Sequence, residues 1–317
     1  MTNRSLRLVF AAFLGWAAAA PAAAAPVGLD PAKLRLASAN VVVIDSAAQR
    51  QVYAKAADEV TPIASLTKLM TAMVVLDSRQ PEGELLAIDT DDFDYLKGSR
   101  SRLRMGTTLS RREMLHLALM SSENRAASSL ARYYPGGTAA FVAAMNRKAI
   151  GLGMTRTHYS DPTGLSAENV STANDLAKLV LAASEYPTIR EFSTTPAHSV
   201  EMQSGALLGF NNSNALVKNQ AWDIQLQKTG YIREAGKCLV MLATIASRPM
   251  VIVLLDSYGK YTRLGDAQRV KHWLETGEAL AVPAEKHRYN GTFPPRAKST
   301  AKVAVRTTPK SRAIRPA

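Results

Sequence analysis

Three short polar motifs in a fixed order constrain this chain more than any other feature, because one fold must bring all three together. They are Ser65-Leu66-Thr67-Lys68, Ser122-Glu123-Asn124 and Lys228-Thr229-Gly230. Together they supply a serine nucleophile, a lysine that can accept its proton, a polar serine and asparagine pair, and a cationic anchor. These are the groups that serine acyl transfer requires. Each motif alone is weak, since Ser-x-x-Lys recurs at 257–260 and 299–302 and Ser-x-Asn at 38–40. Only one ordered set precedes the single Lys-Thr-Gly.

The first motif places a nucleophile and a base on one helix face. An apolar pattern over 63–76, after Pro62, predicts a helix, and residues three apart on a helix share a face, as Ser65 and Lys68 do. A lysine with the usual pKa of about 10.4 is protonated at neutral pH, so Lys68 needs burial or a second cation to act as a base. Lys228 can be that cation, or it can bind a substrate carboxylate. Without such a partner, the motif is an ordinary helix start.

The other two motifs lie where a ligand can approach. Ser122 and Asn124 fall between two apolar helices, where the Ser122 hydroxyl can relay a proton and the Asn124 amide can donate and accept. The alternative is a simple helix cap, for which serine and asparagine are common. Lys228, Thr229 and Gly230 lie inside a predicted strand, and Gly230 allows another backbone, such as an incoming peptide, to approach closely.

Periodicity and turn residues predict an α+β fold. Strands are predicted as a hairpin at 40–45 and 51–55, and later at 200–202, 223–232, 237–246 and 250–256. Helices are predicted at 63–76, from a capping box of Ser110 and Glu113 to 120, at 124–134, from Thr138 to 151, from Thr172 to 183, and at 262–275. This pattern indicates an antiparallel sheet with helices on it, plus a mainly helical lobe over roughly 78–195.

Residues 1–25 have the pattern of a secretory signal peptide. Arg4 and Arg7 precede an apolar run over 8–20 and a small-residue stretch over 22–25. The run is shorter than the roughly 20 residues that span a membrane, so we expect export with cleavage at a position that Pro26 leaves open. An uncleaved N-terminal anchor is the alternative.

The net charge of +13 falls mainly on residues 286–317, which hold nine basic residues and no acidic residue. The body over 26–285 is close to neutral. Because 286–317 contains prolines and few large apolar side chains, it cannot bury a core and is predicted to be disordered. It is either a solvated tail or a polybasic arm for anionic envelope components. No nucleic-acid partner is expected for an exported chain without a nucleic-acid-binding motif.

The sequence predicts neither a disulfide nor a metal centre. Cys238 is the single cysteine and is expected to be a buried strand residue. The acidic cluster of Asp91, Asp92 and Asp94 lacks a calcium-loop pattern and is expected to be a solvated turn. The five histidines are dispersed and show no close spacing to an acidic residue, which disfavours a zinc peptidase: His116, His158, His198, His272 and His287.

The chain resembles the low-molecular-mass penicillin-binding proteins, the serine D,D-peptidases of peptidoglycan. The matching stretches lie within about 38–277 and include 62–73, 118–126, 161–166, Trp222 with Lys228-Thr229-Gly230, and Gly259-Lys260-Tyr261. The resemblance implies the transpeptidase fold shared with serine β-lactamases, one domain over 26–285, and no cofactor. A class A β-lactamase is disfavoured, because Glu123 replaces the aspartate of its Ser-Asp-Asn motif and Glu168 with Asn169 does not fit its deacylating loop.

The resemblance also implies roles for matching residues in catalysis. By this likeness Ser65 forms the acyl-enzyme and Lys68 accepts its proton, while Ser122 and Asn124 complete the polar bridge. By analogy, the backbone N–H groups of Ser65 and Tyr231 form the oxyanion hole.

On the same grounds, Lys228 and Thr229, followed by Gly230, bind the substrate carboxylate. The implied partners are peptidoglycan stem peptides, with β-lactam antibiotics as covalent inhibitors, and the implied location is the periplasm.

The residues alone do not separate an endopeptidase, which cuts cross-links, from a carboxypeptidase, which removes a terminal D-alanine, because both use the same acyl-enzyme. The resemblance favours the endopeptidase subgroup. So does the expectation that the basic segment after Gly277 lacks the C-terminal β-domain of related carboxypeptidases. A catalytically idle peptidoglycan-binding scaffold is an alternative of another class, and the intact nucleophile and base argue against it.

Overall fold

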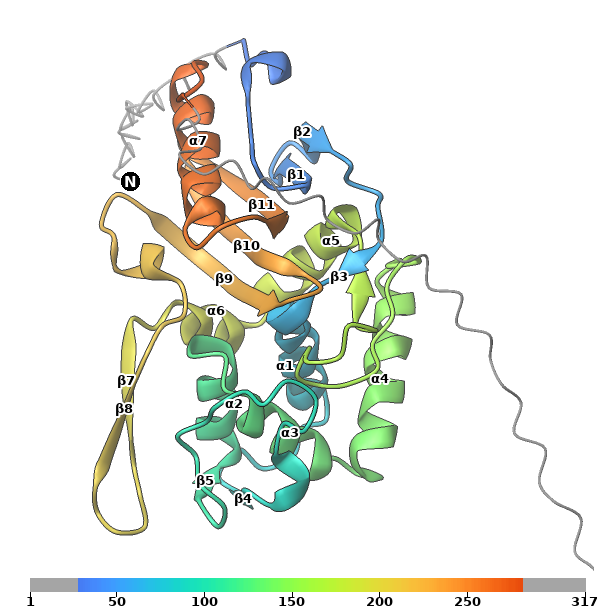
Figure 1. Ribbon diagram of the computed structural model, residues 1–317, viewed down its shortest axis with the longest axis vertical. Helices are drawn as coiled ribbons and strands as arrows, with labels where there is room; N and C mark the ends of the chain where they lie inside the picture. Colours follow the sequence, from blue (N-terminus) through green and yellow to red (C-terminus); the bar gives the residue numbers. More distant parts are fainter. Residues whose placement is uncertain (1–27, 282–317) are drawn as a thin grey trace, which may run out of the picture. The chain divides into compact units, whose positions relative to one another are not determined.

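The computed structural model describes residues 28–281. A five-stranded antiparallel sheet has the strand order β2-β1-β11-β10-β9. Its strands are β1 (Asn40–Asp45), β2 (Arg50–Lys55), β9 (Asp223–Ile232), β10 (Gly236–Ile245) and β11 (Arg248–Ser257). The first hairpin and the three long late strands are confirmed to within two residues. Since β1 pairs with β11, both ends of the described chain build one sheet (Figure 1).

Helices bury both faces of this sheet. In β11, Ile252 and Leu254 pack in one hydrophobic cluster with Trp273, whereas Val251 and Val253 pack in the other. Side chains alternate between faces along a strand, so burial of both faces requires a continuous apolar run such as the one in β11. The first face is covered by α7 (Thr262–Thr276), and the second contacts α5 (Ala173–Ser184) (Figure 1).

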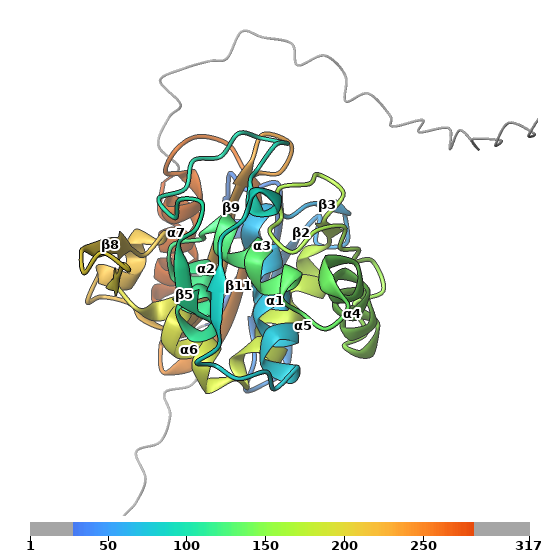
Figure 2. The same ribbon diagram turned by 90° about the horizontal axis from the view of Figure 1, so that it is seen from below.

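The remaining helices surround α1, which contacts α2 to α6 (Figure 2). Their bounds are α1 (Lys68–Asp77), α2 (Arg111–Met120), α3 (Asn124–Arg132), α4 (Gly137–Gly151) and α6 (Pro187–Thr194). The predicted caps of α2 and α5 are confirmed, because the Ser110 and Thr172 side chains accept from the backbone N–H groups of Glu113 and Asp175. The Glu113 carboxylate instead bonds His198.

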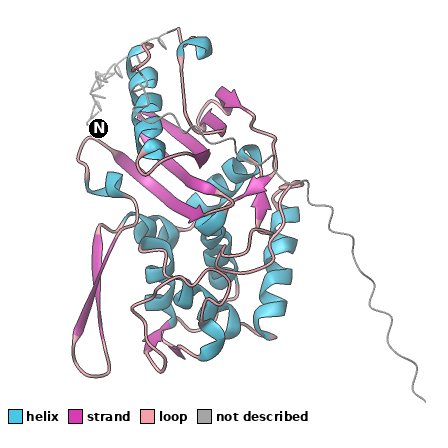
Figure 3. Cartoon of the chain, in the orientation of Figure 1, coloured by secondary structure: helices cyan, strands magenta, loops and turns pink. Residues whose placement is uncertain are grey.

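Small elements complete the fold (Figure 3). Two-residue and three-residue strands form the pairs β3 (Thr61–Pro62) with β6 (Val170–Ser171) and β4 (Leu85–Ala87) with β5 (Thr108–Ser110). A longer hairpin joins β7 (Ala197–Glu201) to β8 (Leu207–Asn211). The 3₁₀ turns are η1 (Pro31–Lys33), η2 (Ala64–Thr67), η3 (Thr90–Asp92) and η4 (Ala215–Lys218).

Several predictions of local structure were wrong. Thr138 does not cap α4; Gly136, whose φ of 86° favours glycine, precedes the helix. The predicted helix over 63–76 begins instead as the 3₁₀ turn η2. Asp92 is not solvated: it is buried and paired with Arg132. Helix α6 and strand β8 were not predicted.

Three further expectations concern Cys238, membrane-spanning segments and the two ends of the chain. Cys238 is fully buried, and burial raises its thiol pKa to about 12, as expected for a structural residue of a strand. Within residues 28–281, no helix has the length and apolar character needed to cross a membrane. The predicted signal peptide over 1–25 and the basic tail over 286–317 lie outside the described residues.

Candidate active site

Ser65 lies on a strained connection between β3 and α1. Ala64, just before it, has a φ of 49°, in a left-handed region that costs an alanine roughly 1–3 kcal/mol. A loop packs directly against this point, since a Cβ atom on Gly164 would lie 2.0 Å from the Ala64 carbonyl oxygen. Only glycine fits there. The surrounding structure thus holds Ser65 in the 3₁₀ turn from which α1 continues at Lys68.

Lys68 is 1% exposed, and its ammonium makes three hydrogen bonds. Its Nζ lies 2.9 Å from Ser65 Oγ, 2.7 Å from Asn124 Oδ1 and 2.7 Å from the Thr163 carbonyl oxygen. The last two atoms can only accept. When Lys68 is neutral they hold its two N–H bonds, so the lone pair points at the Ser65 hydroxyl. This arrangement can remove a proton from the serine.

Burial lowers the pKa of Lys68 to about 7, although the carboxylates of Asp161, Glu123 and Asp94 oppose the shift. At neutral pH a large fraction of this amine is therefore uncharged. The sequence identified the need for such a shift, and the structure supplies its cause.

The second motif meets the first at the start of α3. Asn124 is the first residue of that helix, and its Nδ2 donates to Ser99 Oγ at 2.9 Å, which turns Oδ1 toward Lys68. The N-cap is Glu123, whose side chain accepts from the Arg125 backbone. Capping is therefore not the role of Ser122 or Asn124.

Ser122 itself has a φ of 63°, a left-handed conformation that is uncommon for serine. It faces the third motif, because Lys228 Nζ lies 2.8 Å from Ser122 Oγ. Lys228 also donates to the Thr229 carbonyl at 2.9 Å and is fully buried. Burial, followed by the charges of Lys68 and Arg263, holds the pKa of Lys228 well below its usual range.

The edge strand β9 runs directly beside η2. A Cβ atom on Gly230 would lie 3.0 Å from the Ile63 carbonyl oxygen and 3.3 Å from the Ser65 nitrogen. The close backbone approach predicted for Gly230 is thus made by this chain's own serine segment. Tyr231 follows on the same strand with its side chain 58% exposed.

Sequence reasoning missed the residues that support this site. Ser99 orients Asn124, and Ser213 Oγ lies 2.7 Å from Thr229 Oγ1. Arg263 donates to the Gly230 carbonyl at 3.2 Å. The Thr163 carbonyl is held by a loop in which the Asp161 carboxylate accepts from the backbone N–H groups of residues 163, 164 and 166. Stretch 161–166 was noted only as part of the resemblance.

Comparison with known proteins agrees with this geometry. Residues 27–259 match the family profile of peptidase S11, described as D-alanyl-D-alanine carboxypeptidase. The chain belongs to the peptidase S11 family. This S11 peptidase is therefore a serine D,D-peptidase, and its α+β fold of the penicillin-binding type is confirmed by solved structures.

The S11 peptidase is 50% identical over 293 residues to a D-alanyl-D-alanine endopeptidase of Pseudomonas aeruginosa, covering 91% of this chain and 94% of that protein. It is 47% identical over 281 residues to a D-alanyl-D-alanine endopeptidase of Escherichia coli, covering 88% and 90%. The Streptomyces K15 DD-transpeptidase structure has a TM-score of 0.71 and 28% identity, covering 76% of this chain and 98% of that one.

One polar cluster outside this constellation contradicts the sequence argument about histidines. Glu113 lies three residues before His116, a close spacing that the sequence analysis did not count. The fold brings His198 to the pair, so that ligand atoms of all three residues lie within 4.8 Å of one another.

Proposed function

We propose that this S11 peptidase is a D,D-endopeptidase that hydrolyses D-alanyl cross-links of peptidoglycan through an acyl-enzyme on Ser65. Penicillins acylate the same serine. The observation that carries the proposal is the hydrogen bond of 2.9 Å between Ser65 Oγ and a buried Lys68 whose pKa is about 7. Preference for cross-links is supported by the similarity to two proteins named D-alanyl-D-alanine endopeptidase.

Acylation begins when neutral Lys68 takes the Ser65 proton and Oγ attacks the carbonyl carbon of the D-alanyl bond. The backbone N–H groups of Ser65 and Tyr231 stabilise the resulting oxyanion, a contribution of about 3 kcal/mol for each donor. Lys68 then returns the proton to the departing amine by way of the Ser122 hydroxyl, while Asn124 Oδ1 accepts from Lys68 and orients it. Water hydrolyses the ester with Lys68 again as base, which releases the shortened peptide and regenerates Ser65.

The clustered cationic side chains of the site support substrate anchoring. Lys228 is buried, and its pKa is lowered partly by the neighbouring charges of Lys68 and Arg263. A substrate carboxylate beside Lys228 and Thr229 relieves this repulsion and gains charge-assisted hydrogen bonds. Gly230 lets the strand that carries this anchor lie against the serine turn.

Covalent labelling tests the nucleophile. A fluorescent penicillin should label the wild type and a Ser46→Ala control. Ser46 lies in the turn after β1, where its hydroxyl donates to the Pro249 carbonyl, and it is not part of the candidate active site. It should not label Ser65→Ala. Labelling of Ser65→Ala would remove this serine from the nucleophile role.

Digestion of purified muropeptides, followed by chromatography, tests the bond that is cut. Conversion of cross-linked dimers to monomers supports the endopeptidase. Trimming of pentapeptides with dimers left intact supports the carboxypeptidase, the alternative favoured by the description of the matching family. Labelling without any digestion would support the idle scaffold.

We further propose that residues 1–25 export the enzyme to the periplasm and that 286–317 is a polybasic arm for anionic envelope components. The nine basic residues of that segment support the second proposal. Deletion after Glu285 should leave penicillin acylation unchanged and reduce retention on purified sacculi at low salt, where screening is weak. Unchanged retention would refute the arm.

A further inference from the structure

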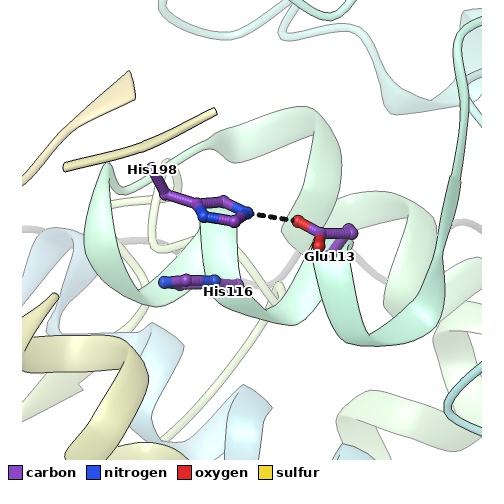
Figure 4. Close-up of side chains that lie close together, drawn as sticks. All are labelled: Glu113, His116 and His198. Carbon is purple, nitrogen blue, oxygen red and sulfur yellow. Dashed lines mark hydrogen bonds and ion pairs between the residues drawn. The ribbon is translucent and has the colours of Figure 1, made fainter. Parts of the chain in front are cut away.

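Two histidines and a glutamate from separate parts of the chain converge beside α2. Glu113 and His116 lie one turn apart on α2 and therefore share a face, and His198 reaches them from β7 (Figure 4). His198 Nε2 lies 2.8 Å from Glu113 Oε2. One ligand atom from each of the three residues lies within 4.8 Å of the other two.

His116 is the buried member of this cluster and is incompletely bonded. It is 8% exposed, and its Nε2 has no hydrogen-bond partner among the residues that the structure describes. Its ring stacks between Phe192, at a centroid distance of 4.2 Å, and His198, at 4.3 Å.

We propose that Glu113, His116 and His198 form a binding site for a divalent transition metal, for which Zn²⁺ is the best-fitting ion. Zinc takes imidazole nitrogen and carboxylate oxygen, and two histidines with one glutamate form a known ligand set whose fourth position holds water. Magnesium and calcium prefer oxygen ligands and do not suit two imidazoles.

Side-chain rotation is needed to complete the coordination, because the His116 and His198 rings are stacked at an interplanar angle of 28° and an imidazole binds a metal in its ring plane, so His198 must turn out of the stack. Tetrahedral zinc with bonds of about 2.0–2.1 Å separates its ligand atoms by about 3.4 Å. The present spread of up to 4.8 Å closes by rotation of Glu113 and His198, whose side chains are 34% and 28% exposed. The ion takes the place of the hydrogen bond between Glu113 and His198 and links both residues to His116 through metal–ligand bonds.

Arg112, a cation close enough to influence His116, is itself paired with carboxylates. Its guanidinium lies 4.7 Å from the ring centroid of Phe192, and the same Phe192 ring stacks with His116. It also pairs with Glu82 at 3.0 Å and with Glu191 at 3.5 Å. Two carboxylates therefore compensate its charge, and Glu113 is left to the cluster.

A metal ion at this place ties the hairpin of β7 and β8 to α2. The chain after β8 reaches Ser213, whose N–H donates to the Met120 carbonyl at the end of α2 and whose hydroxyl contacts Thr229. The ion is thus a structural clamp on elements that flank the catalytic cleft, and the inference does not depend on which peptide bond the enzyme cuts.

Zinc titration of the purified chain, carrying no polyhistidine tag, against a chromophoric chelator tests the site. We expect one tightly bound ion in the wild type and in the matched control His158→Ala, because His158 is exposed and outside the cluster. His198→Ala and the near-isosteric Glu113→Gln should each weaken binding at least 100-fold. Zinc should raise Tm by several degrees in the first two proteins and not in the last two.

Penicillin labelling of each variant shows that it is folded, so a failed fold is not mistaken for a lost site. Cobalt substitution should give the visible bands of four-coordinate Co²⁺ in the wild type and in His158→Ala, and not in His198→Ala or Glu113→Gln. The proposal would be overturned if the wild type did not bind zinc stoichiometrically. It would also be overturned if Glu113→Gln and His198→Ala bound zinc as tightly as the wild type.

Discussion

Cationic side chains have different partners in two regions of this enzyme. Where α3 packs on η3, Arg132 lies 2.8 Å from the fully buried Asp92 carboxylate, which also accepts from the Asp89 backbone. In the candidate active site, Lys68 and Lys228 are more deeply buried than Arg132, which is 25% exposed, and their hydrogen bonds within the described residues go to hydroxyl, amide and carbonyl oxygens.

The type of hydrogen-bond partner distinguishes the arginine, which forms a structural ion pair, from the two lysines, for which we propose catalytic and binding roles. A carboxylate partner neutralises the arginine, and this hydrogen bond raises its pKa. Neutral acceptors leave the lysines with an uncompensated desolvation cost, so their pKa values fall. This pattern supports the proposed roles of Lys68 as the base for Ser65 and of Lys228 as the anchor for a substrate anion.

Removal of the cleft's base should have the largest effect. We expect Lys68→Ala to lower the acylation rate with fluorescent penicillin by about 10³-fold, within the range for a positioned general base. Its fold should persist, since the substitution removes a buried charge. The exposed Lys218→Ala serves as control. A rate at pH 7 within a few-fold of wild type would show that another group deprotonates Ser65.

Loss of the second lysine should be selective. A hydrogen bond to a charged group contributes about 1.5–3 kcal/mol, so Lys228→Ala should weaken kcat/KM about 10-fold to 100-fold for substrates with a free carboxylate. Amidated substrates already lack the partner and should lose much less. Equal losses on both substrates would argue against the anchor and for a structural role of Lys228.

The paired region should respond in stability and not in chemistry. Asp92→Asn leaves Arg132 without its carboxylate, and because that arginine is 25% exposed we expect a loss of about 2 kcal/mol. This corresponds to a decrease in Tm of about 5 °C for a domain of this size. Acylation by penicillin at a temperature well below Tm should be unchanged. An Asp92→Asn variant with the Tm of wild type would show that the Arg132–Asp92 pair does not stabilise the fold.

The pH dependence of acylation reports the cleft directly. The lowered pKa of Lys68, about 7, makes the amine neutral as pH rises through that value. The acylation rate should therefore increase about tenfold from pH 6 to pH 8 and level off above it. A rate that keeps rising toward pH 10 would mean that the lysine retains its usual pKa.

The sequence predicted the proposed catalytic residues because their chemistry depends on side-chain type and local spacing. Ser65 and Lys68 share a turn, and the continuous apolar runs of β10 and β11 predict their strands without help from the rest of the chain. The 3₁₀ start at Ala64 was not predictable, since its positive φ occurs where a loop distant in sequence, containing Gly164, packs against its backbone.

Groups that act through backbone atoms or through a distant loop leave no such trace. The Thr163 carbonyl carries no residue preference, and Arg263 is one arginine among many until α7 brings it to Gly230. The Glu113 and His116 pair was visible at helical spacing. It gained meaning only when the hairpin brought His198 to it.

Ser99 gives the smallest test of how neutral partners hold the cleft. Its hydroxyl accepts from Asn124 Nδ2 at 2.9 Å, and the Asp94 carboxylate fixes its own backbone N–H at 2.8 Å. Ser99→Ala leaves every catalytic group in place and removes only the bond that keeps Asn124 Oδ1 toward Lys68. We expect a decrease in acylation rate of a few-fold, consistent with about 1 kcal/mol for one neutral hydrogen bond.

Because an amide that turns its NH₂ toward Lys68 no longer accepts from the ammonium, the apparent pKa of the rate profile should fall below that of wild type. Ser99→Thr, which keeps a hydroxyl, should restore both rate and profile. A lower rate with an unchanged profile would mean that the loop serves substrate binding and that Ser99 does not orient Asn124.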